Sequence, residues 1–577
     1  MFQGSVITLS PVLPAVNRAL APGLLILLLA ACGGGGGGTD DDASDDADAA
    51  DVLAEDDAST DVIEDDAPPP DGYDPPTGIP APPFGIVETV ESVYGSRDHF
   101  TYYVDNSHAE ATDTDNPYGS PETPRLTIPG DLEAGDVVQV HGGPYWPEGD
   151  RFSFRGQGTE SEPIIITGAR SSPNPVLTNF VHFPDAQWTI FENFTIETDG
   201  NYGLELRPLE SDTPIHHVSI RMVTLHGSGR FKSSEQFAAH SDDDTSPISY
   251  VVFYGNTSQD AGEWNAEEED DTSCFSVQHN CSHVWILENV GYRSGGDGVI
   301  LAHNAAFSTH HVYIGRNTFY ENRENGIDIK EANDVIVSEN AIYSHRPVSS
   351  SSGEGIVVHY DPQNVWLLNN IIADCEMGIV ITGARDAWVV GNVLYNINHT
   401  GSDWDPESGY SMGAGVHFRG DSSGGVVSNT FHACDTGVQL SAGTTSYALW
   451  NNIFSDRAES SSHDIRIANS EIAAVTELDY SLFSGARVYW ADASYDVAGL
   501  QSGPGQCASC PAGAAAEFED AGVGDFHLTV DSPARDVGDA HAVYGIFEDR
   551  YSISIEEDID ELARPQGSGW DVGAYEF

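Results

Sequence analysis

One short apolar segment recurs along the chain as His283-Val-Trp-Ile-Leu-Glu-Asn289, His311-Val-Tyr-Ile-Gly-Arg-Asn317 and Asp334-Val-Ile-Val-Ser-Glu-Asn340. Further copies fill the stretch from Ser282 to Ile453. Each copy is followed by a turn and then by a Gly that opens an alternating strand, as in Gly326-Ile-Asp-Ile.

These repeats predict a β solenoid. Their final Asn positions, from Asn289 to Asn452, are 22 to 37 residues apart, which is a solenoid period. The strands are short, alternate in polarity and are separated by Gly and Asn, which favours β structure over helix. One such turn cannot bury its own apolar face, but stacked turns can, with strands about 4.8 Å apart. We therefore predict a parallel β-helix.

The repeated Asn predicts a ladder of side chains. Asn tolerates a left-handed backbone and hydrogen-bonds locally, so it suits a tight turn that recurs in register. Stacked Asn side chains can also form a ladder along the stack. Looser copies of the segment end upstream at Asn193 and Asn256, and we place them in the same series.

Most of the variation in repeat length falls in one turn, between each Asn and the next Gly. The longest inserts there run from Arg346 to Ser352 and from His399 to Met412. Insertions in a solenoid collect on one face, which is often the binding face.

The chain before the repeats also has strand-like runs, which include Tyr102-Tyr-Val-Asp105, Ala134-Gly-Asp-Val-Val-Gln-Val140 and Pro163-Ile-Ile-Ile-Thr-Gly168. With the repeats, this opening resembles that of the pectate-lyase-like, right-handed parallel β-helix proteins. The resemblance implies an all-β, right-handed parallel β-helix with an N-terminal cap over residues 99–490. It leaves the activity open, because this fold hosts lyases, hydrolases, epimerases and non-catalytic surface proteins.

The last segment, residues 491–577, lacks the repeat. It ends in Arg564-Pro-Gln-Gly-Ser-Gly-Trp-Asp-Val-Gly-Ala-Tyr-Glu-Phe577, which resembles the C-terminal segment of bacterial surface β-helix proteins. We expect it to cap the last turn, whose edge strands would otherwise be open for pairing.

Residues 1–32 resemble a bacterial lipoprotein signal peptide. The apolar core Leu24-Leu-Ile-Leu-Leu-Leu29 is short for a transmembrane helix. Leu29-Ala-Ala-Cys32 resembles a lipobox, which implies that Cys32 is lipidated and that Gly33 directs the exported protein to the outer membrane or cell surface. The alternative is an ordinary signal peptide or a buried anchor.

Residues 33–98 are predicted to be a disordered linker. From Thr39 to Pro83 there are 16 Asp and Glu and no Lys or Arg, followed by Pro-rich sequence. Such a tract cannot bury enough apolar surface to order itself.

The whole chain is strongly acidic, with 91 Asp and Glu against 23 Lys and Arg and a net charge of −68. This balance argues against nucleic acid as a partner. An anionic polymer would need metal or salt to approach. The expected partners are a polysaccharide and, through the lipid anchor, a membrane, and the protein is expected to be a monomer.

The cysteines predict two local disulfides in an exported protein, Cys274 with Cys281 and Cys507 with Cys510. Cys375 and Cys434 occupy equivalent places on turns separated by one other turn. They would then be about 9 to 10 Å apart, beyond disulfide reach, so we predict free thiols.

Strand register predicts where polar groups gather. If Ile327 and Ile329 point into the core, Asp328 and Lys330 point outward. Carrying this register along the stack gives two outward columns, one of Asp328, Val357, Val380 and His417 and the other of Lys330, His359, Thr382 and Arg419. Four basic or imidazole groups thus lie beside the long inserts, which predicts a ligand surface to which Tyr360 and Glu354 also belong. For any single residue, the alternative is an ordinary polar surface.

Lys330-Glu-Ala-Asn333, followed one turn later by Ile356-Val-Val-His359-Tyr360, resembles the alginate lyase and chondroitinase B type of β-helix lyase. The resemblance implies that Lys330 is the base and that His359 stands where the family has Arg. The family also holds calcium with an Asn and two Glu. Here Asp328 and Glu324 are the nearest acids, so Ca²⁺ is the one cofactor expected.

The roles of the four basic groups follow from charge. We expect the adjacent cations Lys330 and His359 to lower each other's pKa, which favours a neutral base near pH 7. Arg419 would clamp a carboxylate, and His417 would orient the chain.

Two classes of function remain open. One is a surface-anchored enzyme that cleaves a uronate-containing glycan by β-elimination, or a glycoside hydrolase with Asp328 and Glu354 as its two carboxylates. The other is a non-catalytic protein that binds glycans or partner cells, or that builds the envelope. Ultraviolet absorbance of an unsaturated uronate product separates these classes.

Overall fold

The computed structural model describes residues 72–169, 173–198, 202–209, 213–227, 235–241, 245–262, 264, 271–302, 309–348, 351–399, 413–441, 446–458, 462–511 and 515–577. The proposed signal peptide, Cys32 and most of the acidic tract lie outside these ranges. No helix among the described residues is long and apolar enough to cross a membrane. Residues 69–577 form one compact unit.

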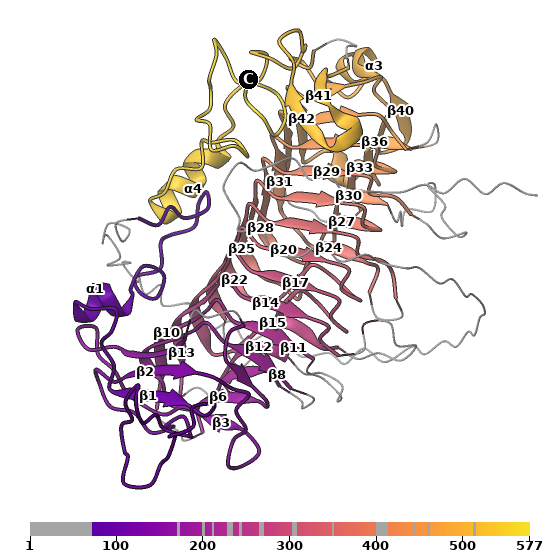
Figure 1. Ribbon diagram of the computed structural model, residues 1–577. Helices are drawn as coiled ribbons and strands as arrows, with labels where there is room; N and C mark the ends of the chain where they lie inside the picture. Colours follow the sequence, from indigo (N-terminus) through magenta and orange to yellow (C-terminus); the bar gives the residue numbers. More distant parts are fainter. Residues whose placement is uncertain are drawn as a thin grey trace, which may run out of the picture. The chain divides into compact units, whose positions relative to one another are not determined.

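The chain is a right-handed parallel β-helix in which each turn passes through three sheets (Figure 1). The first sheet contains β1 (Tyr102–Asp105), β2 (Val137–His141), β4 (Ile164–Gly168), β7 (Gln187–Glu192), β10 (Ile215–Arg221), β13 (Ile248–Tyr254), β16 (Cys281–Leu287), β19 (His310–Gly315), β22 (Asn333–Ser338), β25 (Gln363–Leu368), β28 (Arg385–Val390), β31 (Gly424–Val427), β34 (Tyr447–Trp450) and β37 (Thr476–Asp479).

The second sheet has the shortest strands. It contains β5 (Val176–Leu177), β8 (Thr195–Glu197), β11 (Thr224–His226), β14 (Thr257–Gln259), β17 (Val290–Tyr292), β20 (Thr318–Tyr320), β23 (Ala341–Tyr343), β26 (Ile371–Ala373), β29 (Val393–Tyr395), β32 (Thr430–His432), β35 (Ile453–Ser455) and β38 (Leu482–Phe483).

The third sheet carries the predicted site. It contains β3 (Phe152–Ser153), β6 (Val181–Phe183), β9 (Leu204–Leu206), β12 (Glu235–Ser241), β15 (Ser273–His279), β18 (Val299–Ala302), β21 (Ile327–Lys330), β24 (Glu354–His359), β27 (Met377–Thr382), β30 (Ala414–Arg419), β33 (Thr436–Leu440), β36 (His463–Ile467), β39 (Val488–Trp490) and the antiparallel β40 (Ala493–Tyr495).

Few elements lie outside the sheets. They are α1 (Val90–Tyr94), α2 (Ser470–Ala473), α3 (Val497–Ser502), the hairpin of β41 (Phe518–Asp520) and β42 (Asp525–Leu528) around the short helix η1 (Ala521–Val523), and α4 (Val543–Tyr551).

Alternating side chains of the three sheets fill the bore of the helix. The predicted inward residues are all fully buried in one cluster and comprise Ile327, Ile329, Val358, Ile379, Ile381 and Phe418. Burying such a side chain stabilises the fold by about 1.5–3 kcal/mol. The predicted register is confirmed.

The Asn ladder is confirmed from Asn256 to Asn452. At each step the backbone N–H and the Nδ2 of one Asn donate to the Oδ1 of the next, as between Asn317 and Asn340 at 2.9 Å. The predicted reason was wrong in part, because the left-handed residue is the one before the ladder Asn, such as Glu339 with φ of 58°. Asn193 itself has φ of 64°, so it occupies that turn position and not the ladder.

Residues 72–98 are ordered, which corrects the predicted linker boundary. Ile79 and Phe84 are buried against the outer face of the first sheet. The indole N–H of Trp285 donates to the carbonyl of Pro80 at 2.8 Å, and the Ser219 hydroxyl donates to that of Gly85 at 2.6 Å. We call residues 72–88 the strap, because they lie lengthwise across strands from β25 to β10. A few apolar residues inside a Pro-rich tract were enough to dock it, which composition alone did not reveal.

The segment after β39 has two parts. Leu500, Cys507 and Cys510 pack into the core at the last turn. Residues 515–577 instead run back along the outside of the helix, where α4 lies beside the strap in Figure 1. The ring of Phe547 in α4 packs edge-on against Trp366 of the first sheet, with centroids 4.8 Å apart. The expected cap is therefore only the first part of this segment.

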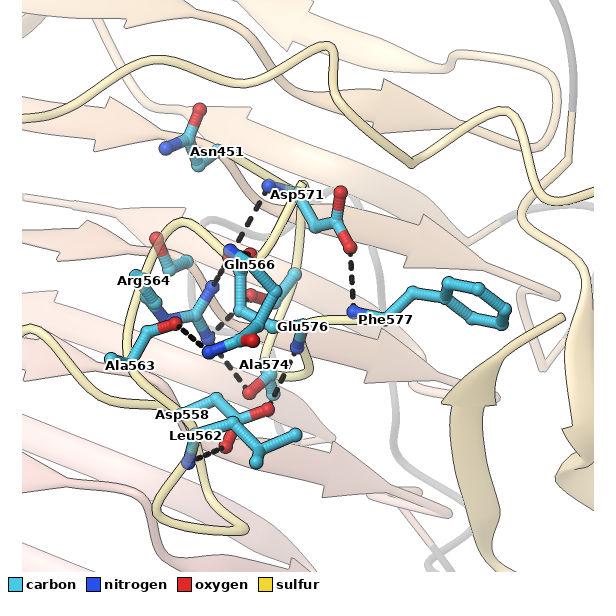
Figure 2. A network of polar contacts seen from close by, with 12 residues as sticks. Asn451, Asp558, Leu562, Ala563, Arg564, Gln566, Asp571, Ala574, Glu576 and Phe577 are labelled. Atoms are coloured by element: carbon cyan, nitrogen blue, oxygen red, sulfur yellow. Dashed lines mark hydrogen bonds and ion pairs between the residues drawn. The ribbon is translucent and has the colours of Figure 1, made fainter. Parts of the chain in front are cut away.

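The chain end is held by a buried ion pair, shown in Figure 2. Arg564 contacts Glu576 at 2.9 Å, and both side chains are almost fully buried. Arg564 also donates to the carbonyls of Gly573 and Ala574 at 3.1 and 2.8 Å. Three donors of Arg564 are thus hydrogen-bonded, which offsets the cost of burying its charge.

The cysteines divide differently from the prediction. Cys507 and Cys510 form a disulfide with Cα atoms 4.9 Å apart, and Cys375 and Cys434 are free, as predicted. Cys274 and Cys281 are also free, so that predicted disulfide is wrong. Cys274 belongs to β15 in the third sheet and Cys281 to β16 in the first, and the turn between them directs the thiols to different partners.

Candidate functional site

The outer face of the third sheet brings Lys330 and His359 together. They are register partners at the ends of β21 and β24, and Asp328 is paired with Val357. Further along, Val380 is paired with His417 and Thr382 with Arg419. Both predicted columns therefore exist, but the first is buried and not an open groove, because Val357 and Val380 pack in one apolar cluster.

Asp328 joins the two predicted catalytic residues. Its Oδ2 lies 3.0 Å from the Lys330 Nζ, and its Oδ1 lies 2.8 Å from the His359 Nε2. The Asp328 side chain is 5% exposed, whereas those of Lys330 and His359 are 20% and 26% exposed. A buried carboxylate thus holds two groups that reach solvent.

This carboxylate reverses the predicted charge effect on Lys330. Burial alone would lower the Lys330 pKa, but the neighbouring carboxylates, Asp328 first, outweigh burial and raise the pKa above its ordinary 10.5. The expected depression by His359 is wrong for Lys330, because the prediction did not place an anion between the two residues. The Lys330 side chain therefore stays protonated at neutral pH and does not act as the base there.

The His359 ring is held through one of its two nitrogens. Because an ionised carboxylate only accepts, the His359 Nε2 donates to Asp328, and a neutral ring then keeps its lone pair on Nδ1. No residue in the described ranges hydrogen-bonds to that Nδ1. The Tyr360 ring lies 4.4 Å from the imidazole and is 53% exposed.

Asp297 belongs to the same cluster and was missed. Its Oδ1 accepts hydrogen bonds from the Asn325 backbone N–H at 3.0 Å and side-chain Nδ2 at 2.9 Å. Burial, followed by the charges of Asp328 and Glu324, raises its pKa well above the ordinary range. The repeat contained the signal, because Asp297 precedes Gly298 as Asn325 precedes Gly326 one turn later.

The arrangement of these acids bears on the expected calcium. Within the part of the chain that the structure describes, no three His, Cys, Asp or Glu side chains are arranged to hold a metal ion. Asp328 is already engaged by Lys330 and His359, and Asp297 is driven toward its neutral form. Binding of Ca²⁺ therefore stays a prediction, and the roles proposed for these side chains do not depend on it.

Glu354 opens β24 beside this cluster. Its Oε2 accepts from the Ser351 hydroxyl at 3.0 Å, and burial raises its pKa. It is 6% exposed, so it contributes little surface to a ligand.

Arg419 and His417 form a second unit two turns further on. The Arg419 Nε donates to the His417 Nδ1 at 3.1 Å, and the His417 Nε2 lies 2.6 Å from the Ser441 hydroxyl. Burial, aided by the charges of Arg419 and Arg466, lowers the pKa of His417 well below its usual value. His417 is 1% exposed and therefore supports Arg419, which corrects its predicted contact with the glycan.

Comparison with known proteins bears on the fold. Residues 276–489 match the family model described as the right handed beta helix region. No curated protein matches the sequence.

Several solved structures are similar to this chain at low identity. A mannuronic acid specific polysaccharide family 6 lyase from human gut microbiota is 14% identical, with a TM-score of 0.38 over 62% of this chain and 83% of that one. The GH136 lacto-N-biosidase from Eubacterium ramulus is 16% identical, with a TM-score of 0.35 over 52% and 65%. The pectate lyase Pel9A is 15% identical, with a TM-score of 0.33 over 82% and 96%. These values are too low to transfer an activity. The sequence match over residues 276–489 and the three stacked sheets together make this chain a right-handed parallel β-helix.

Proposed function

We propose that the protein is a polysaccharide lyase that cleaves a uronate-containing glycan by β-elimination on the outer face of the third sheet. The observation that carries the proposal is the bridge from Asp328 to both Lys330 and His359. It places an oriented imidazole and a protonated ammonium group together at one position that solvent reaches. These are the two groups that β-elimination from a uronate needs first.

The reaction uses these groups in fixed roles. The His359 Nδ1 takes the C5 proton while the Lys330 ammonium stabilises the negative charge that develops on the uronate carboxylate. A C4–C5 double bond forms, the C4–O bond breaks, and the leaving oxygen takes a proton from the Tyr360 hydroxyl. Asp328 keeps His359 in the right tautomer and offsets its positive charge after proton uptake. Solvent then restores both protonation states.

The proposal extends to the setting of the enzyme. The lipobox at Cys32 would anchor it to the bacterial surface, and the acidic tract would hold the β-helix away from the membrane. The glycan would then be extracellular or part of the envelope.

The test is ultraviolet absorbance of the unsaturated product, measured over a panel of polyuronates. We expect His359→Ala, Lys330→Ala and Asp328→Asn each to remove most of the activity, with little change in melting temperature. His226→Ala is the matched control, because His226 is an exposed histidine on the second sheet. If the His359→Ala variant were as active as the wild type, His359 would not be the base.

Two other outcomes would identify a different function. New reducing ends without ultraviolet-absorbing product would indicate a hydrolase with Asp328 and Glu354 as its carboxylates. Binding that weakens in the same variants, with no product from any glycan, would indicate a non-catalytic surface protein.

A further inference from the structure

The outer face of the third sheet continues beyond Arg419 toward the last turn, where it carries Arg466, which is 8% exposed. In register, Gln439 follows His417, Arg466 follows Gln439, and Tyr489 follows Arg466. The Arg466 guanidinium lies 5.5 Å from the centre of the Tyr489 ring, which fixes its direction along the face.

Two more arginines flank Arg466. Arg457, in the turn before β36, contacts both carboxylate oxygens of Asp464 at 3.2 and 3.1 Å. Arg487, directly before β39, donates its backbone N–H to Asp464 at 2.7 Å and its Nη1 to the Ser462 carbonyl at 3.2 Å. Arg457 and Arg487 therefore both contact one buried acid, Asp464.

Basic side chains gather at this end of the third sheet, although the chain as a whole is strongly acidic. The chain has 91 acidic and 23 basic residues. Burial raises the pKa of Asp464 to about 6, and the charges of Arg457 and Arg487 oppose that shift. Burial lowers the pKa of His463 to about 4, and the charges of Arg487, Arg466 and Arg457 contribute to that shift.

His463 gives a second, independent indication of a ligand. It is 6% exposed and starts β36, in the register column that begins at Glu354. Its Nδ1 and the Nε of Arg457 are buried and have no hydrogen-bond partner among the described residues. Both side chains line a small cavity with Phe431 and Phe454 and with the acids Asp456 and Asp464.

We propose that the outer face of the third sheet from Arg419 to Arg487 is a row of distal subsites that bind acidic groups of the glycan, either uronate carboxylates or sulfate esters. This rests on the proposed function and deepens it. Arginine suits such groups because its planar donors match two oxygens at once. From His359 in β24 to Arg466 in β36 there are four strand steps, or about 19 Å, so the ligand is a polyanionic chain of several sugars.

The distal subsites can be tested apart from catalysis. Binding is measured with the full chain carrying His359→Ala, against an unsulfated polyuronate, a sulfated polysaccharide and a neutral glucan. We expect Arg466→Gln and Arg487→Gln each to weaken binding of the preferred anionic polymer roughly tenfold and to reduce its salt dependence. The anionic polymer that binds more tightly identifies the acidic group.

Arg385→Gln is the matched control. Arg385 is an exposed arginine in β28 of the first sheet, so this substitution removes the same charge from another face. We expect it to change the affinity less than twofold. Unchanged affinity in both Arg466→Gln and Arg487→Gln, an equal loss in Arg385→Gln, or preference for the neutral glucan would overturn the distal subsites. If Arg466→Gln does not fold, Arg487→Gln decides.

Different results would refute the lyase activity and the distal subsites. Weaker binding in these variants without any product from the wild type would leave the subsites standing and remove the lyase. Product formation from long chains at equal KM in wild type and Arg487→Gln would remove the subsites and leave the lyase. Short oligosaccharides that end before Arg419 should be cleaved equally well by both proteins.

Discussion

Lys330 can be measured directly, because Lys232 and Lys330 are the only lysines in the sequence. The carboxylates beside Lys330 raise its pKa above 10.5, against the opposing effect of burial. After reductive methylation with a ¹³C label, we expect the Lys330 signal to titrate above an ordinary lysine. Asp328→Asn should shift that titration downward. A midpoint at or below 10.5 in the wild type would contradict the assigned role of Lys330 as a lasting cation.

The sequence predicted the faces of these residues but not their contacts. Alternation placed Asp328 and Lys330 on one side of β21, and the repeat placed His359 beside Lys330, as the structure shows. That the Asp328 carboxylate lies between them depends on side-chain torsions, which a register of Cα positions does not contain. The burial of His417 was missed for the same reason.

At the scale of elements, the Asn ladder is the feature that holds the turns in register. Asn340→Ala would leave the backbone N–H of Asn317 and one of its two Nδ2 hydrogens without an acceptor, since both donate to Asn340 at 2.9 Å. We expect a loss of about 2–4 kcal/mol in the free energy of unfolding, measured by chemical denaturation. Gln363→Ala is the control, since that half-buried side chain makes no hydrogen bond within the described ranges, and it should cost about 0.5 kcal/mol or less. Equal losses in the free energy of unfolding for the two variants would show that the ladder hydrogen bonds add no stability beyond that of an ordinary side chain.

Strands were predictable because their signal is local and repeated. A strand of the second sheet has only two or three residues, yet the Asn before it and the Gly after it recur in almost every turn. The strap and the hairpin of β41 and β42 occur once, so no repetition separates their signal from a loop. The disulfide predicted for Cys274 and Cys281 is wrong because these residues, although only seven positions apart in the sequence, lie in different sheets.

At the scale of the whole described unit, His527 ties the outer C-terminal segment together. Its Nδ1 lies 2.6 Å from Asp525 in β42 and its Nε2 2.5 Å from Asp560 beyond α4. Hydrogen bonds to Asp560 and then Asp525 outweigh burial and raise its pKa from 6.5 to about 9. A raised pKa stabilises the folded state fully below pH 6.5, and this contribution is lost as the pH rises through about 9.

The comparison of wild type with His527→Asn tests this linkage. The wild type should have the higher melting temperature at pH 6, and the difference should shrink as the pH rises from 6.5 to above 9. These groups are more than one third exposed, so the effect is small and salt-dependent. A difference that stays constant across this range would show that the charge on His527 does not hold the segment.

The strap has a mechanical consequence. A solenoid pulled from its end can unravel one turn after another, because each turn contacts only its neighbours. Here the chain enters at the side, where Thr77 bonds to Glu339 at 2.6 Å and Trp285 and Ser219 hold Pro80 and Gly85. Tension from residues before the strap would therefore reach several turns at once, in shear along the first sheet. The strap would have to detach before the force reached β1, so it protects the stacked turns from unravelling one by one.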